Sequence, residues 1–147
     1  MRRFLPLLLS ALLFGAVVCG TEPWTNSDLV QPDQVAKDLN APLVIQVGFP
    51  VLYRSAHITG SVFAGPGSKD EGIADLKKAV AGQPRTREII LYCGCCPWEK
   101  CPNIRPAFAA LHEMGFTHVK AMVVPTNLKT DWIDKGYPTD KRAESDK

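Results

Sequence analysis

The chain has 147 residues, of which 46% are hydrophobic and 22% charged, a globular composition that is long enough for one sizeable core. Leaving out Arg2 and Arg3 of the N-terminal segment, the remaining 15 basic residues balance 15 acidic ones, so nothing indicates a nucleic-acid partner. There is no internal repeat, low-complexity tract or linker, and we expect a single domain.

The first twenty residues differ from the rest of the chain. Two arginines precede an apolar run over 4–18, and small residues surround Cys19, an order typical of a secretory signal peptide. The run is shorter than the roughly 20 residues that span a bilayer. We therefore predict a signal peptide over 1–20 and an exported, periplasmic protein. A lipid on Cys19, or an uncleaved signal, would instead attach the protein to a membrane.

After residue 20, the segment 21–27 reads as a tether, and a domain over 28–139 precedes a polar tail over 140–147. The domain begins with a short helix over 33–39, followed by a strand over 43–47 with the sequence LVIQV. Residues 48–61 favour a connection. A brief strand over 62–64 and a helix over 70–81 follow.

The second half of the domain continues the alternation. We predict a strand over 88–92, a helix over 103–114 that Asn103 would cap, a strand over 118–124, a helix over 127–134 and a turn over 136–138. Strands that alternate with helices in this way predict an α/β fold with a mostly parallel sheet and helices on both faces. The site of such a sheet lies beyond the carboxyl ends of its strands, where Cys93 follows the strand 88–92.

Four of the five cysteines lie within nine residues, at Cys93, Cys95, Cys96 and Cys101. Because this loop joins a strand to a helix, its backbone N–H groups can stabilise an anion, and a thiol there is expected as the nucleophilic thiolate. The same donors would hold a persulfide anion. The residues that we predict to support this anion loop are Gly94, Trp98, Lys100, Asn103 and Arg105.

The domain resembles the rhodanese-like family over residues 28–139. The likeness lies in the strand LVIQV, the segment RSAHITGSVFAG with His57, Gly60 and Ser61, the strand IILYC, and the later segments EMGFTHVKAMVV and WIDKGYP. The resemblance implies a single rhodanese-like α/β domain and sulfurtransferase activity, in which Cys93 carries sulfane sulfur between a small donor and a thiol acceptor. It implies no cofactor and no metal.

The chain departs from the family pattern at several positions. Gln46 and Gly48 stand where the family has an acidic and then a basic residue, and Trp98 stands where its shorter loop has an arginine. The related phosphatases and arsenate reductases need such an arginine to clamp an oxyanion. The sequence therefore argues against those activities.

The cysteine cluster also allows other interpretations. Cys93 and Cys96 have the spacing of redox motifs, with Cys101 as a resolving thiol, and a bridge such as Cys95 to Cys101 could staple the loop. Four thiolates can also bind zinc or cuprous copper. Trp98 could cover the sulfur or anchor the loop, and a rhodanese fold could serve as a binding module without catalysis.

Overall fold

The structure, a computed structural model, describes residues 22–141. The predicted signal peptide, with Cys19, lies outside these residues, as does the tail beyond residue 141. None of the helices in the described part of the chain is long and apolar enough to cross a membrane.

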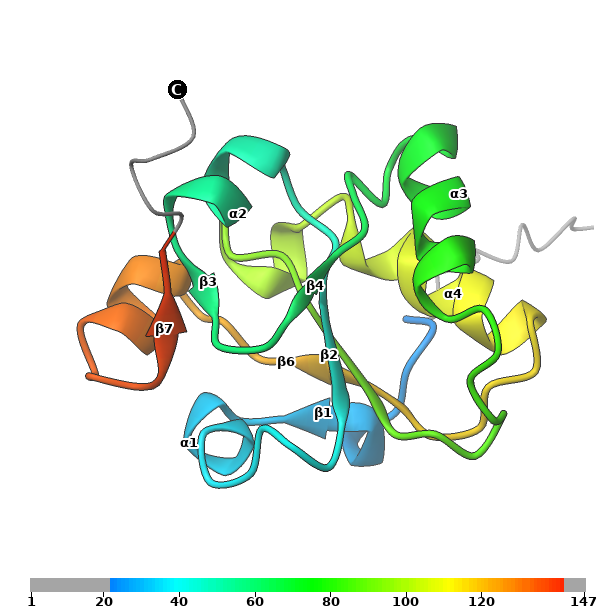
Figure 1. Ribbon diagram of the computed structural model, residues 1–147, viewed down its shortest axis with the longest axis horizontal. Coiled ribbons are helices and arrows are strands. Elements are labelled where there is room, and N and C mark those ends of the chain that lie inside the picture. Colours follow the sequence, from blue (N-terminus) through cyan, green and yellow to red (C-terminus); the bar gives the residue numbers. More distant parts are fainter. Residues whose placement is uncertain (1–21, 142–147) are drawn as a thin grey trace, which may run out of the picture.

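A parallel sheet of five strands runs through the centre of the domain, in the spatial order β1-β6-β5-β2-β4 (Figure 1). All four neighbouring pairs are parallel, so the carboxyl ends of the strands meet at one edge of the sheet. The bounds of its strands are β1 Leu29–Val30, β2 Leu43–Gln46, β4 Val62–Phe63, β5 Ile89–Tyr92 and β6 Val119–Met122. This arrangement confirms the predicted α/β fold with a parallel sheet.

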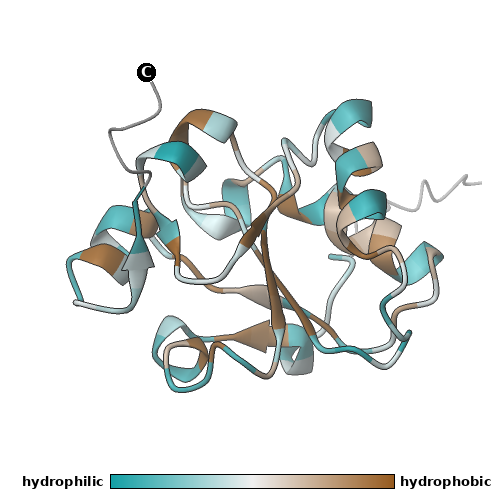
Figure 2. Cartoon of the chain, in the orientation of Figure 1, coloured by the Kyte–Doolittle hydropathy of each residue, from teal (hydrophilic) through white to brown (hydrophobic). Residues whose placement is uncertain are grey.

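Alternate residues of the central strand pack on opposite faces of the sheet. Ile89 and Leu91 lie in a core with the helices α3 (Asp70–Ala79) and α4 (Ile104–Glu113). Ile90 and Tyr92 lie in a second core with α1 (Pro32–Val35) and η3 (Lys129–Ile133). The strands are accordingly hydrophobic in Figure 2, whereas the outer turns of α3 are hydrophilic. Both faces of the sheet are covered, as the alternation of elements predicts.

Apart from β1, which the sequence does not predict, the regular elements lie within one or two residues of the predicted ranges, but three segments differ. The predicted connection over 48–61 contains a helix, α2 (Pro50–Ser55), which begins at a proline. It also contains β3 (His57–Ile58), which pairs antiparallel with β7 (Thr139–Asp140). The predicted helix over 127–134 is a single π-type turn, η3, built around the buried Trp132. The predicted helix over 33–39 ends at Val35 and continues as a turn.

The segment predicted as a tether packs onto the domain where the structure describes it. Trp24 is only 8% exposed, and its ring lies 5.5 Å from those of both Trp98 and Phe108. The short 3-10 helix η1 (Asn26–Asp28) follows and leads into β1. Burial of the large Trp24 indole contributes favourable free energy that orders residues 22–28 against the domain. At the other end, Asp140 belongs to β7 and therefore to the folded domain.

Candidate active site

Cys93 lies directly beyond β5, at the carboxyl edge of the sheet. Its side chain points to the α3 and α4 side and is only 1% exposed. Gly48, which follows β2 by one residue, lies against it: a Cβ added there would be 2.6 Å from the Cys93 carbonyl oxygen and 3.1 Å from its Sγ. A side chain at position 48, where the resemblance leads one to expect a basic residue, would therefore collide with Cys93.

Asn103 donates a hydrogen bond to this cysteine. Its side-chain Nδ2 lies 3.4 Å from Cys93 Sγ, and its Oδ1 accepts a hydrogen bond from the backbone N–H of Ser68 at 3.1 Å. The contact with Ser68 orients the amide so that its N–H group faces the sulfur. Asn103 is fully buried and is the N-cap residue of α4, as predicted, but its side chain makes no capping hydrogen bond. The side chain belongs to the site instead.

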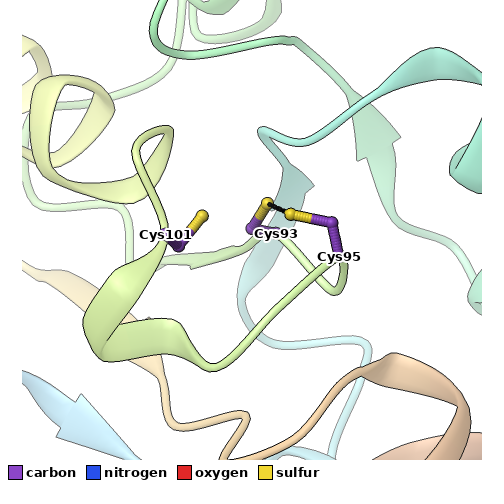
Figure 3. Close-up of side chains that lie close together, drawn as sticks. All are labelled: Cys93, Cys95 and Cys101. Atoms are coloured by element: carbon purple, nitrogen blue, oxygen red, sulfur yellow. Dashed lines mark hydrogen bonds between the residues drawn. The ribbon is translucent and has the colours of Figure 1, made fainter.

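Three further thiols gather around Cys93. Cys95 Sγ lies 3.1 Å from Cys93 Sγ and 3.2 Å from Cys96 Sγ. The sulfur atoms of Cys93, Cys95 and Cys101 all lie within 4.8 Å of one another, although Cys101 comes from the far end of the loop (Figure 3). All four are free thiols. The structure thus brings the predicted loop cysteines together and joins none of them in a disulfide.

The surrounding thiols are held in their protonated form. Burial raises the pKa of Cys95 to about 11, and burial also raises the pKa of Cys96. The hydrogen bond to Cys93, followed by burial, raises the pKa of Cys101 above its ordinary value. At neutral pH Cys95 and Cys101 can therefore donate S–H hydrogen bonds to the Cys93 sulfur.

Two backbone hydrogen bonds attach the cysteine loop to the rest of the domain. Gly94 adopts a positive φ of 82°, and its carbonyl accepts a hydrogen bond from the Leu128 N–H at 3.0 Å. A Cβ at Gly94 would come within 2.9 Å of the Leu128 side chain, so a glycine fits this position on both counts. Farther along, the Trp98 N–H donates to the carbonyl of Val124 at 2.9 Å. The loop is thereby tied to the segments that follow β6.

The other predicted supporting residues lie away from the sulfur. Trp98 packs against Trp24 and so anchors the loop. Arg105 donates two hydrogen bonds to the Glu22 carboxylate, at 2.8 and 2.6 Å, and its guanidinium lies over the Trp24 ring. Lys100 is exposed within the 3-10 helix η2 (Trp98–Lys100). The hydrogen bonds that reach Cys93 Sγ from described side chains come from the Asn103 amide and from thiols, and none comes from a cation.

A cavity of about 560 Å³ adjoins the cysteine loop. Its walls come from the end of β2, from α2 and from the segment 127–133, while Gly94 and Cys95 contribute the loop side. Gln46 lines it, with its Nε2 donating to the Cys93 carbonyl at 3.3 Å. Its Oε1 is buried and has no hydrogen-bond partner among the described residues. The sequence does not predict this cavity, because the segments that line it are far apart in the chain and carry no motif.

The segment 54–61, which carries part of the resemblance described above, packs against the end of β5. Tyr92, the last residue of β5, has a buried hydroxyl that accepts a hydrogen bond from the Ile58 N–H at 3.1 Å and shares another with the Ser61 hydroxyl at 3.0 Å. His57 stacks on Tyr53 and bonds to its carbonyl through Nδ1. These contacts fix the strand that ends at the cysteine.

Comparison with known proteins finds likeness in structure alone. No sequence profile of a known family and no curated protein matches the chain. A rhodanese-like domain from Anabaena sp. is 20% identical with a TM-score of 0.58, over 82% of this chain and 83% of the other. A Bacillus halodurans protein is 18% identical with a TM-score of 0.61, over 79% and 78%.

The homodimeric polysulfide-sulfur transferase from Wolinella succinogenes is 17% identical with a TM-score of 0.55, over 81% and 82% of the two chains. These likenesses agree with the element order and the parallel sheet described above. The domain therefore has the rhodanese-like fold.

Proposed function

We propose that this rhodanese-fold protein is a sulfurtransferase that carries sulfane sulfur as a persulfide on Cys93. The observation that carries the proposal is the surroundings of the Cys93 sulfur, which lies at the carboxyl edge of the sheet with Asn103 Nδ2 at 3.4 Å and Cys95 Sγ at 3.1 Å. Hydrogen-bond donors placed in this way stabilise a sulfur anion in a site that is largely closed to water. The structural likeness to a polysulfide-sulfur transferase supports the same reaction class.

The reaction proceeds in two steps. In the first, Cys93 receives the outer sulfur of a donor such as thiosulfate and becomes a persulfide; a new S–S bond forms as the old one breaks, and sulfite leaves with the bonding electron pair. In the second, an acceptor thiolate attacks the outer sulfur of the persulfide. The Cys93 thiolate then leaves with the bonding pair and is regenerated. Asn103 donates its hydrogen bond to the sulfur anion throughout.

We place this activity outside the cytoplasm. The basic head, apolar run and small-residue end over 1–20 support export to the periplasm. A lipid on Cys19 remains the alternative mature form, and the partners that we propose are a small sulfur donor and a thiol acceptor.

The test is the intact mass of the reduced mature protein before and after incubation with thiosulfate. We expect a gain of one sulfur atom that cyanide removes and that Cys93→Ser abolishes. An unchanged mass, or a gain of the same size in Cys93→Ser, would contradict the proposal. Free thiols and bound metal are counted on the same sample.

The grouping of sulfur atoms favours a second candidate function, the binding of a soft metal ion. Three thiols within 4.8 Å of one another, two of them buried, offer the ligands that cuprous copper prefers. Cuprous ion would be titrated into the reduced protein against a competing chelator. One ion held per chain, without sulfur uptake, would favour this function. Loss of two free thiols per chain in air would instead favour the redox alternative.

A further inference from the structure

Access to the four thiols is unequal. The Cys93 side chain is 1% exposed and that of Cys101 is fully buried, whereas Cys95 is half-buried. Of the four, Cys95 is the one that lines the cavity of about 560 Å³ beside the loop. A small molecule that enters this cavity therefore meets the sulfur of Cys95 before that of Cys93.

The cavity has the features of a binding site for a small polar compound. The buried Gln46 Oε1 offers an acceptor that no described residue satisfies, which is a position for an N–H, O–H or S–H group of a ligand. Lys129 and Lys141 lie at its rim, although Lys129 is paired with Asp134 at 2.7 Å. Leu52 of α2 supplies part of the apolar wall. Lys141 offers positive charge to an anionic sulfur compound, and the Gln46 acceptor suits one that carries an S–H group.

The distance between the sulfurs permits direct transfer. Cys95 Sγ lies 3.1 Å from Cys93 Sγ. The outer sulfur of a Cys95 persulfide, one S–S bond of about 2.05 Å farther, therefore stays within about 5 Å of the Cys93 sulfur and reaches it by rotation of the Cys95 side chain. Cys96 is also half-buried, but it contacts the sulfur of Cys95 at 3.2 Å and does not line the cavity. The order cavity, Cys95, Cys93 thus runs from solvent to the interior.

From this geometry we infer that Cys95 is a second catalytic residue, the thiol that exchanges sulfur with small donors in the cavity, while Cys93 stores the sulfur as a persulfide. The inference rests on the proposed sulfur transfer and assigns its substrate to the cavity between α2, Gln46 and the segment 127–133. Cys93 has two tasks: it first accepts the Cys95 proton and then receives the sulfur.

The steps balance with thiosulfate as donor. Cys95 passes its proton to the Cys93 thiolate and attacks the outer sulfur of thiosulfate, and sulfite leaves with the electron pair of the broken S–S bond. The proton returns to the outer sulfur of the Cys95 persulfide, and the Cys93 thiolate attacks that sulfur. Cys95 leaves with the bonding pair as a thiolate and takes the proton, which leaves a Cys93 persulfide anion. No other oxidant or reductant is needed.

The experiment measures the rate of sulfur loading from thiosulfate, followed by intact mass, in the wild-type protein and in Cys95→Ser. The serine keeps a hydrogen-bond donor beside Cys93 and removes only the exchangeable sulfur. We expect loading to slow by about tenfold or more. Cys96→Ser removes the neighbouring half-buried thiol and is expected to have the smaller effect.

A pair of variants with all thiols intact tests the cavity itself. Leu52→Trp narrows the cavity and should slow loading. Val51→Trp adds the same side chain on the preceding residue of α2, which is 62% exposed and does not line the cavity, and should load like the wild type. This comparison holds even if Cys95→Ser disturbs the loop.

The outcomes separate the two claims. If the wild type loads and Cys95→Ser loads at the same rate, or if Cys96→Ser is the slower variant, Cys95 is not the exchange thiol and only the proposed function stands. If Leu52→Trp loads like Val51→Trp, the donor does not use this cavity. If the wild type takes up no sulfur, both the proposed function and the inference are overturned.

Discussion

Asn103 is the residue that most distinguishes this site chemically. It supplies a neutral hydrogen-bond donor to the Cys93 sulfur, and its position is maintained by the Ser68 N–H on its other side. The described cations nearest to the loop in sequence are directed elsewhere, with Arg105 paired to Glu22 at 2.6 Å. A neutral donor stabilises a singly charged persulfide without favouring larger oxyanions, which fits sulfur transfer better than phosphate chemistry.

Replacing this amide tests its role. In Asn103→Asp the oxygen that accepts from Ser68 can remain, but the donor facing Cys93 is replaced by a carboxylate oxygen that repels a sulfur anion. We expect sulfur loading to fall by about 100-fold, the usual cost of losing one donor to a developing anion. Asn103→Ala loses both contacts and serves as the comparison. Loading of Asn103→Asp at the wild-type rate would contradict the assigned role.

Cys95 should react with alkylating reagents in a manner that reflects its burial. Because burial raises its pKa to about 11, the thiolate fraction at neutral pH is small and grows as the pH rises. In chelator-treated protein, the rate of its alkylation by iodoacetamide should rise about tenfold per pH unit from pH 7 to 10, as for any thiol below its pKa. Peptide mapping identifies the site.

The control is the same cysteine in protein unfolded by urea. There the rate should level off near the ordinary thiol pKa of about 8.5. If the rate in the folded protein also levels off at this pH, burial does not raise the pKa of the Cys95 thiol.

Among the elements, the N-terminal segment before β1 has a larger role than a tether. Trp24 contacts Trp98 in the cysteine loop and Phe108 on α4, and Arg105 lies over its ring. One side chain thus links the start of the domain, the loop and the helix that carries Asn103. The loop's geometry depends on this contact as much as on its own sequence.

Truncation of Trp24 should loosen the loop and lower the free energy of unfolding. Trp24→Ala removes an almost fully buried indole, which costs about 3 kcal/mol in a packed core. Urea unfolding measures the loss, and Trp24→Phe, which keeps an aromatic ring, should lose less. A loss below about 1 kcal/mol for Trp24→Ala would show that the segment contributes little to the core.

α2 and η3 act together although about 75 residues separate them in sequence. Each contributes a wall of the cavity. The strand that follows α2, β3, lies beside the strand that follows η3, β7 (Figure 1). The register His57 to Asp140 and Ile58 to Thr139 joins the segment that follows α2 to the one that follows η3. The cavity therefore owes its shape to a long-range pairing.

At the scale of the whole molecule, the parallel order of the sheet places every strand's carboxyl end at one edge, and the two cores cover its faces. The helices and loops at this edge are free to differ from those of the structures compared. The sheet and its two cores maintain the fold, while the edge can vary. The same fold can therefore occur with a sequence identity of only 17 to 20% to the structures compared.

Export remains a prediction from residues 1–20. Expressed as the full chain in a bacterium with a periplasm, the protein should lose about the first twenty residues and be recovered from the periplasmic fraction. The N-terminal sequence and the intact mass of the recovered protein measure this. Replacement of Leu7 and Leu8 by Arg in the apolar run is the control that should block processing. An N-terminus that starts at Met1, in protein from the cytoplasm, would contradict the prediction.

The sequence by itself determined the alternation of the longer strands and helices, the position of Cys93 after the central strand and the resemblance to rhodanese-like domains. These features are local: short apolar, β-branched runs in 43–47 and 88–92, helical spacing in 70–81 and 103–114, and cysteines that are close in the chain. Short elements escaped because a six-residue helix or a two-residue strand has too few residues to show a period.

Only the tertiary structure decided which side chains act on the sulfur. Asn103 looked like a helix cap, and Ser68, 35 residues away, turned its amide to Cys93 instead. The four thiols looked equivalent, and the packing of α2, Gln46 and the segment around Leu128 buried Cys93 and left Cys95 at the cavity. Such differences arise from contacts between segments distant in the chain, and no local pattern of residues encodes them.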